Sequence, residues 1–310
     1  TEGHVRGGER MKRLKAKSDG AIRGYDLRRP SVSIGYSIMF VVLVIAFVVS
    51  LLPILWVVLA GFKELQEFTR GVKGLDNHYH PQFFPVSFKL DGYLKTWNQM
   101  KYYRFYLNSL WVVLGSCVSA LLFNGLIAYV ISRLKPRGHK IVYGLILGSL
   151  MLPATTSMVP LFINITNLKL IGSFLPLWLC IGANAFYVVL FKSFYDAMPT
   201  SLLEAARLDG CNDLSLFFRI VMPLSMPINM VILIYAVNAA WSDFLLPYLV
   251  LSNTPLETVM VRLFTYRTSD RVNDIDVIRA IVFAIIPPIL LFIAFQRQIT
   301  QNVVSAGIKG

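Results

Sequence analysis

Residues 30–62 read PSVSIGYSIMFVVLVIAFVVSLLPILWVVLAGF, and this run contains no Asp, Glu, Lys or Arg. An α-helix rises about 1.5 Å per residue and the hydrocarbon core of a bilayer is about 30 Å thick, so about 20 such residues cross it. A helix buried inside a soluble protein needs only about 10–14 apolar residues. The run is therefore typical of a transmembrane helix.

Five more runs without a charged side chain follow it along the chain. They cover residues 105–132, 141–168, 170–191, 220–242 and 280–296. The last run is the shortest, and we expect Arg279 and Arg297 at its ends to extend their charged groups into the membrane interface. The composition agrees, because only 15% of the residues are charged, against about 25% in soluble domains. The sequence predicts an all-α membrane protein with six transmembrane helices. The three cysteines are an odd number and exclude a disulfide scaffold.

The basic residues predict the orientation of these helices. Residues 1–32 carry nine Lys/Arg against four acidic residues, and the loop 133–140 (RLKPRGHK) carries four basic residues and no acid. Short basic loops stay in the cytoplasm, so we expect both termini inside and the long segment 63–104 outside. The leader is not a signal peptide, because the apolar run after it is too long. The net charge of +13 thus points to membrane orientation rather than to nucleic acid.

The polar segment 199–223 lies between the fourth and fifth apolar runs, on the side predicted to be cytoplasmic. Ser201 and Glu204 have the spacing of a capping box, which predicts a short helix beginning near residue 201. Gly210 suits the left-handed position after a helix, and Asn212 or Asp213 would cap a second helix that runs to Pro223. The segment is predicted to form a helix–turn–helix on the cytoplasmic face.

The same segment resembles a known family. Glu204-Ala205-Ala206, three residues, Gly210, nine residues and then IVMP at 220–223 match the EAA loop of binding-protein-dependent ABC importer permeases. Only Met222 departs from the family pattern, which has leucine there. Further segments are similar to the carbohydrate branch, the maltose-type second permease: Asn108-Ser109-Leu110, Ala128-Tyr129 ahead of Ser132-Arg133, Met151-Leu152-Pro153 through Pro160, Trp241-Ser242-Asp243-Phe244 through Pro247, and the ending from Gln296-Arg297 through AGIKG at 306–310. Asn302 departs from that ending.

The resemblance implies a type I ABC importer permease fold and the permease subunit of a sugar importer. Its partners would be a second homologous permease, two ATP-binding subunits on the cytoplasmic side and an extracytoplasmic solute-binding protein. ATP and Mg²⁺ would be bound by the ATPase, and this chain would bind no cofactor. The positions that would couple to the ATPase are Glu204, Ala205, Ala206, Asp209, Gly210 and Pro223. The expected organisation is a basic leader (1–32), a first transmembrane helix (33–62), an extracytoplasmic segment (63–104), a permease core (105–298) that includes the coupling loop (199–223), and a cytoplasmic tail (299–310).

Polar residues inside the apolar runs have two interpretations. Such groups must find partners away from lipid, so they face the bundle interior or a cavity. They either hydrogen-bond between helices or line the path of the sugar. The candidates for the substrate pathway are Asn124, Asn184, Asn238, Trp241 and Asp243. Asn238 and Trp241 share one helical face, and an amide beside an aromatic ring suits a sugar. We expect Trp97, Tyr102, Tyr103 and Tyr106, ahead of the second helix, to form an interfacial aromatic belt.

Other function classes fit less well. No G-x-x-x-x-G-K-[ST] motif occurs, so the energy must come from a partner. No Ser/His/Asp or paired-carboxylate set indicates an enzyme, and no catalytic or metal site is predicted. The remaining alternatives are a permease for a non-sugar solute, or a gradient-driven secondary transporter. The latter usually needs ionisable residues inside the membrane.

Overall fold

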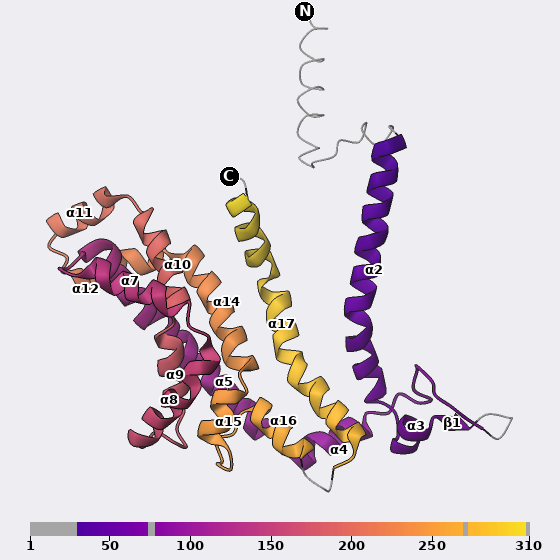
Figure 1. Cartoon of the computed structure of the whole chain (residues 1–310). Coiled ribbons are helices and arrows are strands. Elements are labelled where there is room, and N and C mark those ends of the chain that lie inside the picture. Colours follow the sequence, from indigo (N-terminus) through magenta and orange to yellow (C-terminus); the bar gives the residue numbers. More distant parts are fainter. Residues whose placement is uncertain (1–29, 74–77, 269–271, 308–310) are drawn as a thin grey trace, which may run out of the picture. The chain divides into compact units, whose positions relative to one another are not determined.

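The computed structural model describes residues 30–73, 78–268 and 272–307, and these are mostly helical (Figure 1). The chain divides into two compact units, Thr1–Leu59 and Ala60–Gly310. Most of the predicted basic leader and the last three residues of the predicted tail lie outside the described residues.

The first unit contributes one long helix, α2 (Pro30–Ala60). Its apolar side chains are exposed all round the helix; Val41 and Phe47, for example, are 53% and 65% exposed. A helix that is apolar on every side is stable in lipid or against another protein, not in water. By length and composition, residues Val32–Ala60 are able to span a membrane, which confirms the first predicted helix.

The second unit begins with short elements. They are α3 (Leu65–Arg70), a two-stranded antiparallel sheet of β1 (Val72–Lys73) and β2 (Tyr79–His80), and α4 (Asp91–Met100). In the sheet, Val72 lies opposite His80. None of these elements is long enough to cross a bilayer, in agreement with the prediction that 63–104 is not a membrane span.

Arg279 ties this segment to the last helix, α17 (Asp274–Gly307). Its Nε and Nη2 atoms donate to the carbonyls of Gly61 and Lys63, both at 2.8 Å, and Nη1 pairs with Asp276 at 2.9 Å. The side chain is only 10% exposed. The expectation that Arg279 extends towards the interface is therefore wrong, because three internal acceptors satisfy its guanidinium.

The second apolar run forms one uninterrupted helix that ends at Leu134. It consists of α5 (Tyr102–Ser119), the π-helical turn η2 (Ala120–Asn124), α6 (Gly125–Tyr129) and the π-helical turn η3 (Val130–Leu134). Lys135 then adopts a left-handed conformation, and Pro136 follows. Residues Tyr102–Leu134 are long and apolar enough to cross a membrane, as the run 105–132 predicted.

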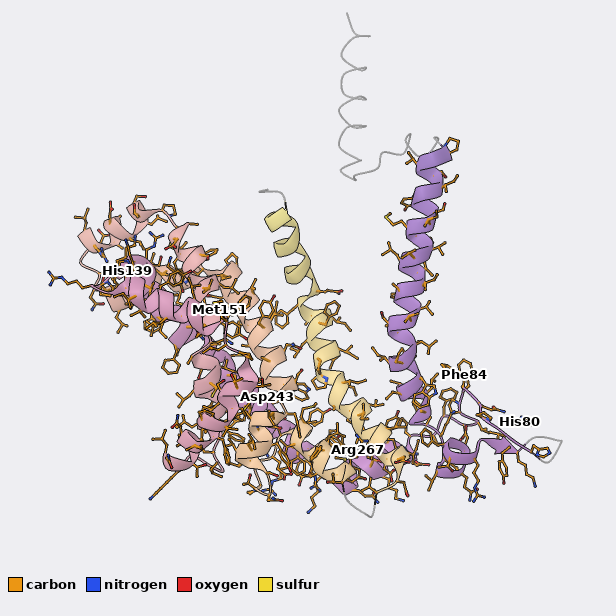
Figure 2. All side chains as sticks on the ribbon, in the orientation of Figure 1. His80, Phe84, His139, Met151, Asp243 and Arg267 are labelled. Carbon is orange, nitrogen blue, oxygen red and sulfur yellow. The ribbon has the colours of Figure 1, made fainter. Side chains whose placement is uncertain are left out.

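The third apolar run is not a single helix. It is divided into α7 (His139–Ser149) and α8 (Ala154–Asn167). Met151, which Figure 2 labels at this junction, is 86% exposed. Pro153 disfavours helical conformation in the residue before it and stands directly ahead of α8. The prediction of one helix over 141–168 is thus wrong, and α7 and α8 are each shorter than the about 20 residues a crossing needs.

Two further candidate spans are bent pairs of helices. Helices α9 (Leu175–Gly182) and α10 (Ala185–Asp196) meet at 42°. Helix 213–224 consists of α12 (Asp213–Leu216), the π-helical turn η4 (Phe217–Val221) and α13 (Met222–Leu224). It meets α14 (Met226–Ser242) at 83°, so the fifth apolar run is broken at Ser225.

In the described part of the chain, three helices are able to span a membrane by length and composition, and up to five if each bent pair is one span. The third of the unbroken helices is the Asp274–Gln296 part of α17, which continues to Gly307 through most of the predicted tail. Helices α15 (Leu245–Leu251) and α16 (Val259–Arg267) complete the unit.

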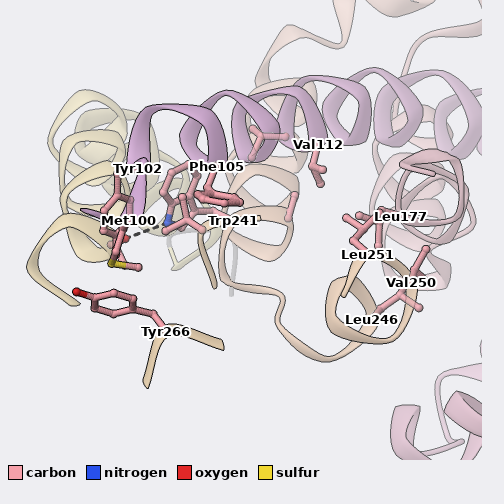
Figure 3. Packing of buried hydrophobic residues seen from close by; sticks show 14 of the residues in the cluster. Met100, Tyr102, Phe105, Val112, Leu177, Trp241, Leu246, Val250, Leu251 and Tyr266 are labelled. Carbon is pink, nitrogen blue, oxygen red and sulfur yellow. Dashed lines mark hydrogen bonds between the residues drawn. The ribbon is translucent and has the colours of Figure 1, made fainter. Parts of the chain in front are cut away.

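Buried side chains form two apolar clusters in the second unit. The cluster in Figure 3 gathers around Tyr102 and Trp241, where α5, α14 and α17 meet. The other gathers around Tyr195 and Phe217, next to α10 and α12. Tyr102 is completely buried and Trp97 stacks on it at 5.4 Å between ring centroids. The expectation of an interfacial belt is therefore wrong for Tyr102, because α17 covers it.

Helix α17 continues through Pro287–Pro288 without interruption. A proline has no N–H, so each leaves the carbonyl four residues earlier without its helical partner. These two carbonyls belong to Phe283 and Ala284. The hydroxyl of Tyr106 donates to the first, and Nε1 of Trp241 donates to the second at 3.1 Å (Figure 3). Aromatic donors from α5 and α14 thus replace the two bonds that the prolines remove.

We predict that Trp241→Phe lowers the free energy of unfolding by about 1–3 kcal/mol, because it leaves the buried carbonyl of Ala284 unpaired. In a Pro288→Ala background the cost should shrink, since the alanine N–H can pair with that carbonyl. Thermal unfolding of the wild type, the two single variants and the double variant, each purified in detergent, measures the coupling. An equal loss in both backgrounds would contradict this assignment.

Candidate functional site

Helix α11 (Thr200–Leu208) lies at one end of the second unit, beside α12 and near the start of α7 (Figure 1). Leu203 and Ala206 are buried on its inner side, where they join the cluster around Phe217. Glu204 and Ala205 are exposed. The helix therefore presents a carboxylate next to a side chain without bulk.

The predicted capping box at the start of α11 is wrong. Pro199 is the N-cap, with no side-chain hydrogen bond, and the helix begins at Thr200. Ser201 thus lies inside the first turn, whereas a capping hydroxyl has to come from the residue ahead of the helix. Glu204 is left without a capping role.

The predicted end of α11 at Gly210 is confirmed. Gly210 has φ 84°, a conformation that only glycine adopts without cost. Its N–H donates to the carbonyl of Arg207 at 3.0 Å, and the N–H of Cys211 donates to Ala206 at 3.1 Å. This pair of bonds is a Schellman motif, with Asp209 as the exposed C-cap.

Helix α12 begins at the cap that the sequence predicts. The side chain of Asn212 accepts from the N–H of Ser215 at 2.7 Å. Arg207 of α11 pairs with Asp213 at 3.0 Å, and because both are about half exposed, the pair adds little stability. Pro223 is exposed in α13, just before the 83° bend.

Arg133 and Ser132 connect this end of the unit to the long helix 102–134. Neither was among the site residues predicted from the sequence. Arg133 donates to the carbonyls of Tyr195 and Met198, the latter just ahead of α11. The hydroxyl of Ser132 donates to Asp196 at 2.5 Å. The basic loop that indicated orientation begins at Arg133, but its composition gave no signal for these bonds.

Asn124 and Asn184 meet at the bend between α9 and α10. Asn124 is completely buried, and its amide donates to the carbonyls of Ala120 at 2.9 Å and Ile181 at 3.0 Å. Its Oδ1 accepts from the backbone N–H of Asn184 at 2.9 Å, and the side chain of Asn184 caps α10 by accepting from Tyr187. Both asparagines therefore pair with the backbone at this bend: Asn124 bonds between two helices, and Asn184 caps its own helix.

Asn229 has the same role at the 83° bend. Its amide donates to the carbonyl of Met222 at 2.8 Å, across the break. The hydroxyl of Ser225 donates to the carbonyl of Val221 at 2.6 Å.

Asn238 and Trp241 line a cavity of about 210 Å³ between α14 and α17. The structure thus brings these two candidates together. Asn238 is exposed, whereas Trp241 is only 4% exposed and already donates its N–H to Ala284. Most of the remaining lining is apolar: Ile234, Tyr235, Val237, Pro288, Leu291, Phe292 and Phe295.

Asp243, labelled in Figure 2, lies past the end of α14 and is not among the residues that line the cavity. Burial raises the pKa of its carboxyl group, while the backbone N–H groups of Phe244, Leu245 and Leu246 act in the opposite direction. Asp243 therefore holds the turn into α15 and does not contribute to the cavity. Within the described ranges, no group of three or more His, Cys, Asp or Glu is placed to hold a metal ion.

Comparisons with known proteins identify relatives. The family described as binding-protein-dependent transport system inner membrane component matches residues 121–305, more than half of the chain. The arabinooligosaccharides transport system permease protein AraQ of Bacillus subtilis is 30% identical over 84% of this chain and 91% of its own length. The diacetylchitobiose uptake system permease protein NgcG of Streptomyces coelicolor is 28% identical, over 86% and 87%.

A solved structure shares the fold. One chain of a bacterial ABC transporter involved in the import of the acidic polysaccharide alginate superposes with a TM-score of 0.76. The match covers 86% of this chain and 97% of that chain, at 22% sequence identity. The type of fold expected for 105–298 is thereby supported.

We predict that Asn124→Leu lowers the free energy of unfolding by about 1–3 kcal/mol, because it leaves buried backbone groups at the α9–α10 bend unpaired. The matched control is Asn164→Leu, at an exposed amide on α8 for which no side-chain hydrogen bond is found among the described residues. Thermal unfolding in detergent measures both. Equal stability of the two variants would show that Asn124 does not hold the bend.

Proposed function

Because the chain belongs to the binding-protein-dependent transport system inner membrane components, multi-pass proteins of the cytoplasmic membrane, we propose that it is the permease subunit of an ATP-driven carbohydrate importer. It forms part of the translocation pathway, and a partner ATPase hydrolyses ATP. The observation that carries this proposal is the exposed helix α11, with Glu204 and Ala205 on its outer side and a Schellman motif at Gly210.

The carbohydrate as substrate is supported by the relatives. AraQ and NgcG are described as permeases for arabinooligosaccharides and diacetylchitobiose. The cavity beside Asn238 and Trp241 suits a sugar, because it offers an amide next to an aromatic side chain. Because its lining has few polar groups, a second, homologous permease supplies the other polar contacts to the sugar.

We propose six crossings with both termini in the cytoplasm. The crossings are α2, the helix 102–134, α7 with α8, α9 with α10, α14, and α17. The basic loop 133–140 and α11 then lie on one side, where two ATP-binding subunits dock. An extracytoplasmic solute-binding protein delivers the sugar to the opposite side.

The proposed coupling uses α11 as a lever. A groove of the ATPase holds the outer side of the helix, with Glu204 as its charged contact and Ala205 allowing close approach of the backbone. When the ATPase closes on ATP, α11 moves with it. Arg133 and Ser132 bind the chain just ahead of α11, so the movement reaches the helix 102–134. The path to the sugar then opens alternately to the two sides.

We predict that Glu204→Lys reduces uptake at least about tenfold, since a lost hydrogen bond to a charged group costs about 1.5–3 kcal/mol. The control Glu64→Lys makes the same charge change at the exposed N-cap residue of α3. It should leave uptake unchanged. Gly210→Pro should abolish uptake, because proline holds φ near about −65° and Gly210 needs φ 84°.

The readouts are sugar uptake in cells and ATPase activity of the assembled transporter, with the amount of inserted chain measured by immunoblot. We expect normal insertion and ATP hydrolysis without transport. If uptake persists in both variants, α11 is not the coupling helix.

We predict that Asn238→Leu raises the KM for sugar about fivefold, the cost of one neutral hydrogen bond of about 1 kcal/mol, without changing insertion. Asn98→Leu, at an exposed position on α4 outside the cavity, is the control. An unchanged KM in Asn238→Leu would remove Asn238 from the substrate pathway.

A further inference from the structure

Helix α17 consists of two halves that are held differently. The first half runs from Asp274 to Pro287, and the second half begins at Pro288. The buried residues among its described side chains all belong to the first half: Ile275, Arg279, Ala280, Val282 and Ala284. From Pro288 to Gln296 no side chain is buried. The tightly packed part of the helix therefore ends at the two prolines.

Hydrogen bonds to other helices show the same border. The hydroxyl of Tyr102 donates to the carbonyl of Ala280 at 2.6 Å. Together with the bonds that Arg279, Tyr106 and Trp241 make, it fixes the first half of α17 to α5, α14 and the segment after α2. Each of these anchors lies before the prolines.

The backbone of α17 is weakest at this border. Pro287 and Pro288 remove two of the hydrogen bonds that join one helical turn to the next, and sharp bends in helices are typically found at proline. Tyr106 and Trp241 pair the two carbonyls that the prolines leave without helical partners. Because neither donor belongs to α17, bending at the prolines leaves both carbonyls paired.

The cavity beside Asn238 lies against the second half of α17. One side of it consists of residues from that half: Pro288, Leu291, Phe292 and Phe295. Helix α14 forms the other side and is bound to the first half through Trp241. The angle between the two halves therefore sets the width of the cavity. At about 210 Å³, the cavity is smaller than the about 300–1,000 Å³ typical of ligand sites.

We propose that Pro287–Pro288 is a hinge, about which the second half of α17 swings away from α14 and widens this cavity. The sugar binds the widened form, a step that rests on the proposed function. Only the fraction of molecules in that form is available to the sugar, so the hinge lowers the apparent affinity by this fraction. The first half of α17 keeps its place on α5.

The test measures distances in the full chain reconstituted in lipid bilayers, with the three cysteines replaced by alanine. Double electron–electron resonance compares two pairs of spin labels that share a reference at Leu114 of α5, an exposed position. The second label is at Ile286, before the prolines, or at Ile293, beyond them, and both positions are exposed. Seven residues make about two helical turns, so both labels project from the same side of α17.

We expect one distance for the pair that includes Ile286 and two distances for the pair that includes Ile293. Pro287→Ala restores a backbone hydrogen bond that bending would break, and it leaves the cavity lining unchanged. It should lower the population of the second distance about fivefold, the contribution of one neutral hydrogen bond. Adding Pro288→Ala should lower this population about fivefold again.

The matched control is Pro53→Ala/Pro160→Ala, which removes two exposed prolines from the interiors of α2 and α8. It should leave both distances and their populations unchanged. A second measurement follows the cavity itself, through the rate at which the thiol reagent MTSEA modifies Leu291→Cys. Pro287→Ala should lower this rate about fivefold as well, because the reagent enters the widened form.

Three outcomes would overturn the proposal. A single distance at Ile293 in the otherwise unchanged chain would mean that the second half does not swing. Two distances at Ile286 as well would mean that α17 moves as one rod. An equal effect of the control, or none of Pro287→Ala, would remove the prolines from the movement. Neither measurement needs a sugar or an ATPase, so the hinge can fail while the proposed function stands, and the reverse.

Discussion

Every backbone N–H and C=O inside this bundle needs a partner, because neither lipid nor a packed interior supplies water. The constraint is tightest where helices bend or contain proline. Asn124 pairs the backbone at the α9–α10 bend, and Asn229 bridges the bend before α14. Tyr106 and Trp241 satisfy the carbonyls that Pro287–Pro288 leave free. The scarce polar groups of the membrane part are therefore mostly engaged in holding its bends.

The end of the unit that carries α11 is held together differently. Its inner side is an apolar cluster around Phe217, and polar bonds from Arg133 and Ser132 hold the chain that leads into the helix. The outer side of α11 is exposed. This combination of a fixed base and an exposed outer surface is what the proposed lever between two proteins requires.

Several features were predictable because they are local. Charge-free length identified α2, the helix 102–134 and α17, and the end of α11 at Gly210 and the cap at Asn212 followed from the residue types that these positions need. The wrong predictions of unbroken helices share one cause. A run without charged residues shows that a segment is apolar, but it does not show whether the backbone continues as one helix. The runs 141–168 and 220–242 therefore gave no sign of the break before Pro153 or of the bend at Ser225.

The sequence by itself determined that the chain is an apolar helical protein of a transporter family, since hydropathy and motif spacing are properties of consecutive residues. Only the tertiary structure decided which polar side chains are free. The amide of Asn124 donates to the carbonyl of Ile181, whereas Asn238 lines a cavity together with Trp241. Arg133, Lys135, His139 and Lys140 likewise line one cavity only because α10 packs beside them, since a cavity depends on distances between segments that the chain order does not contain.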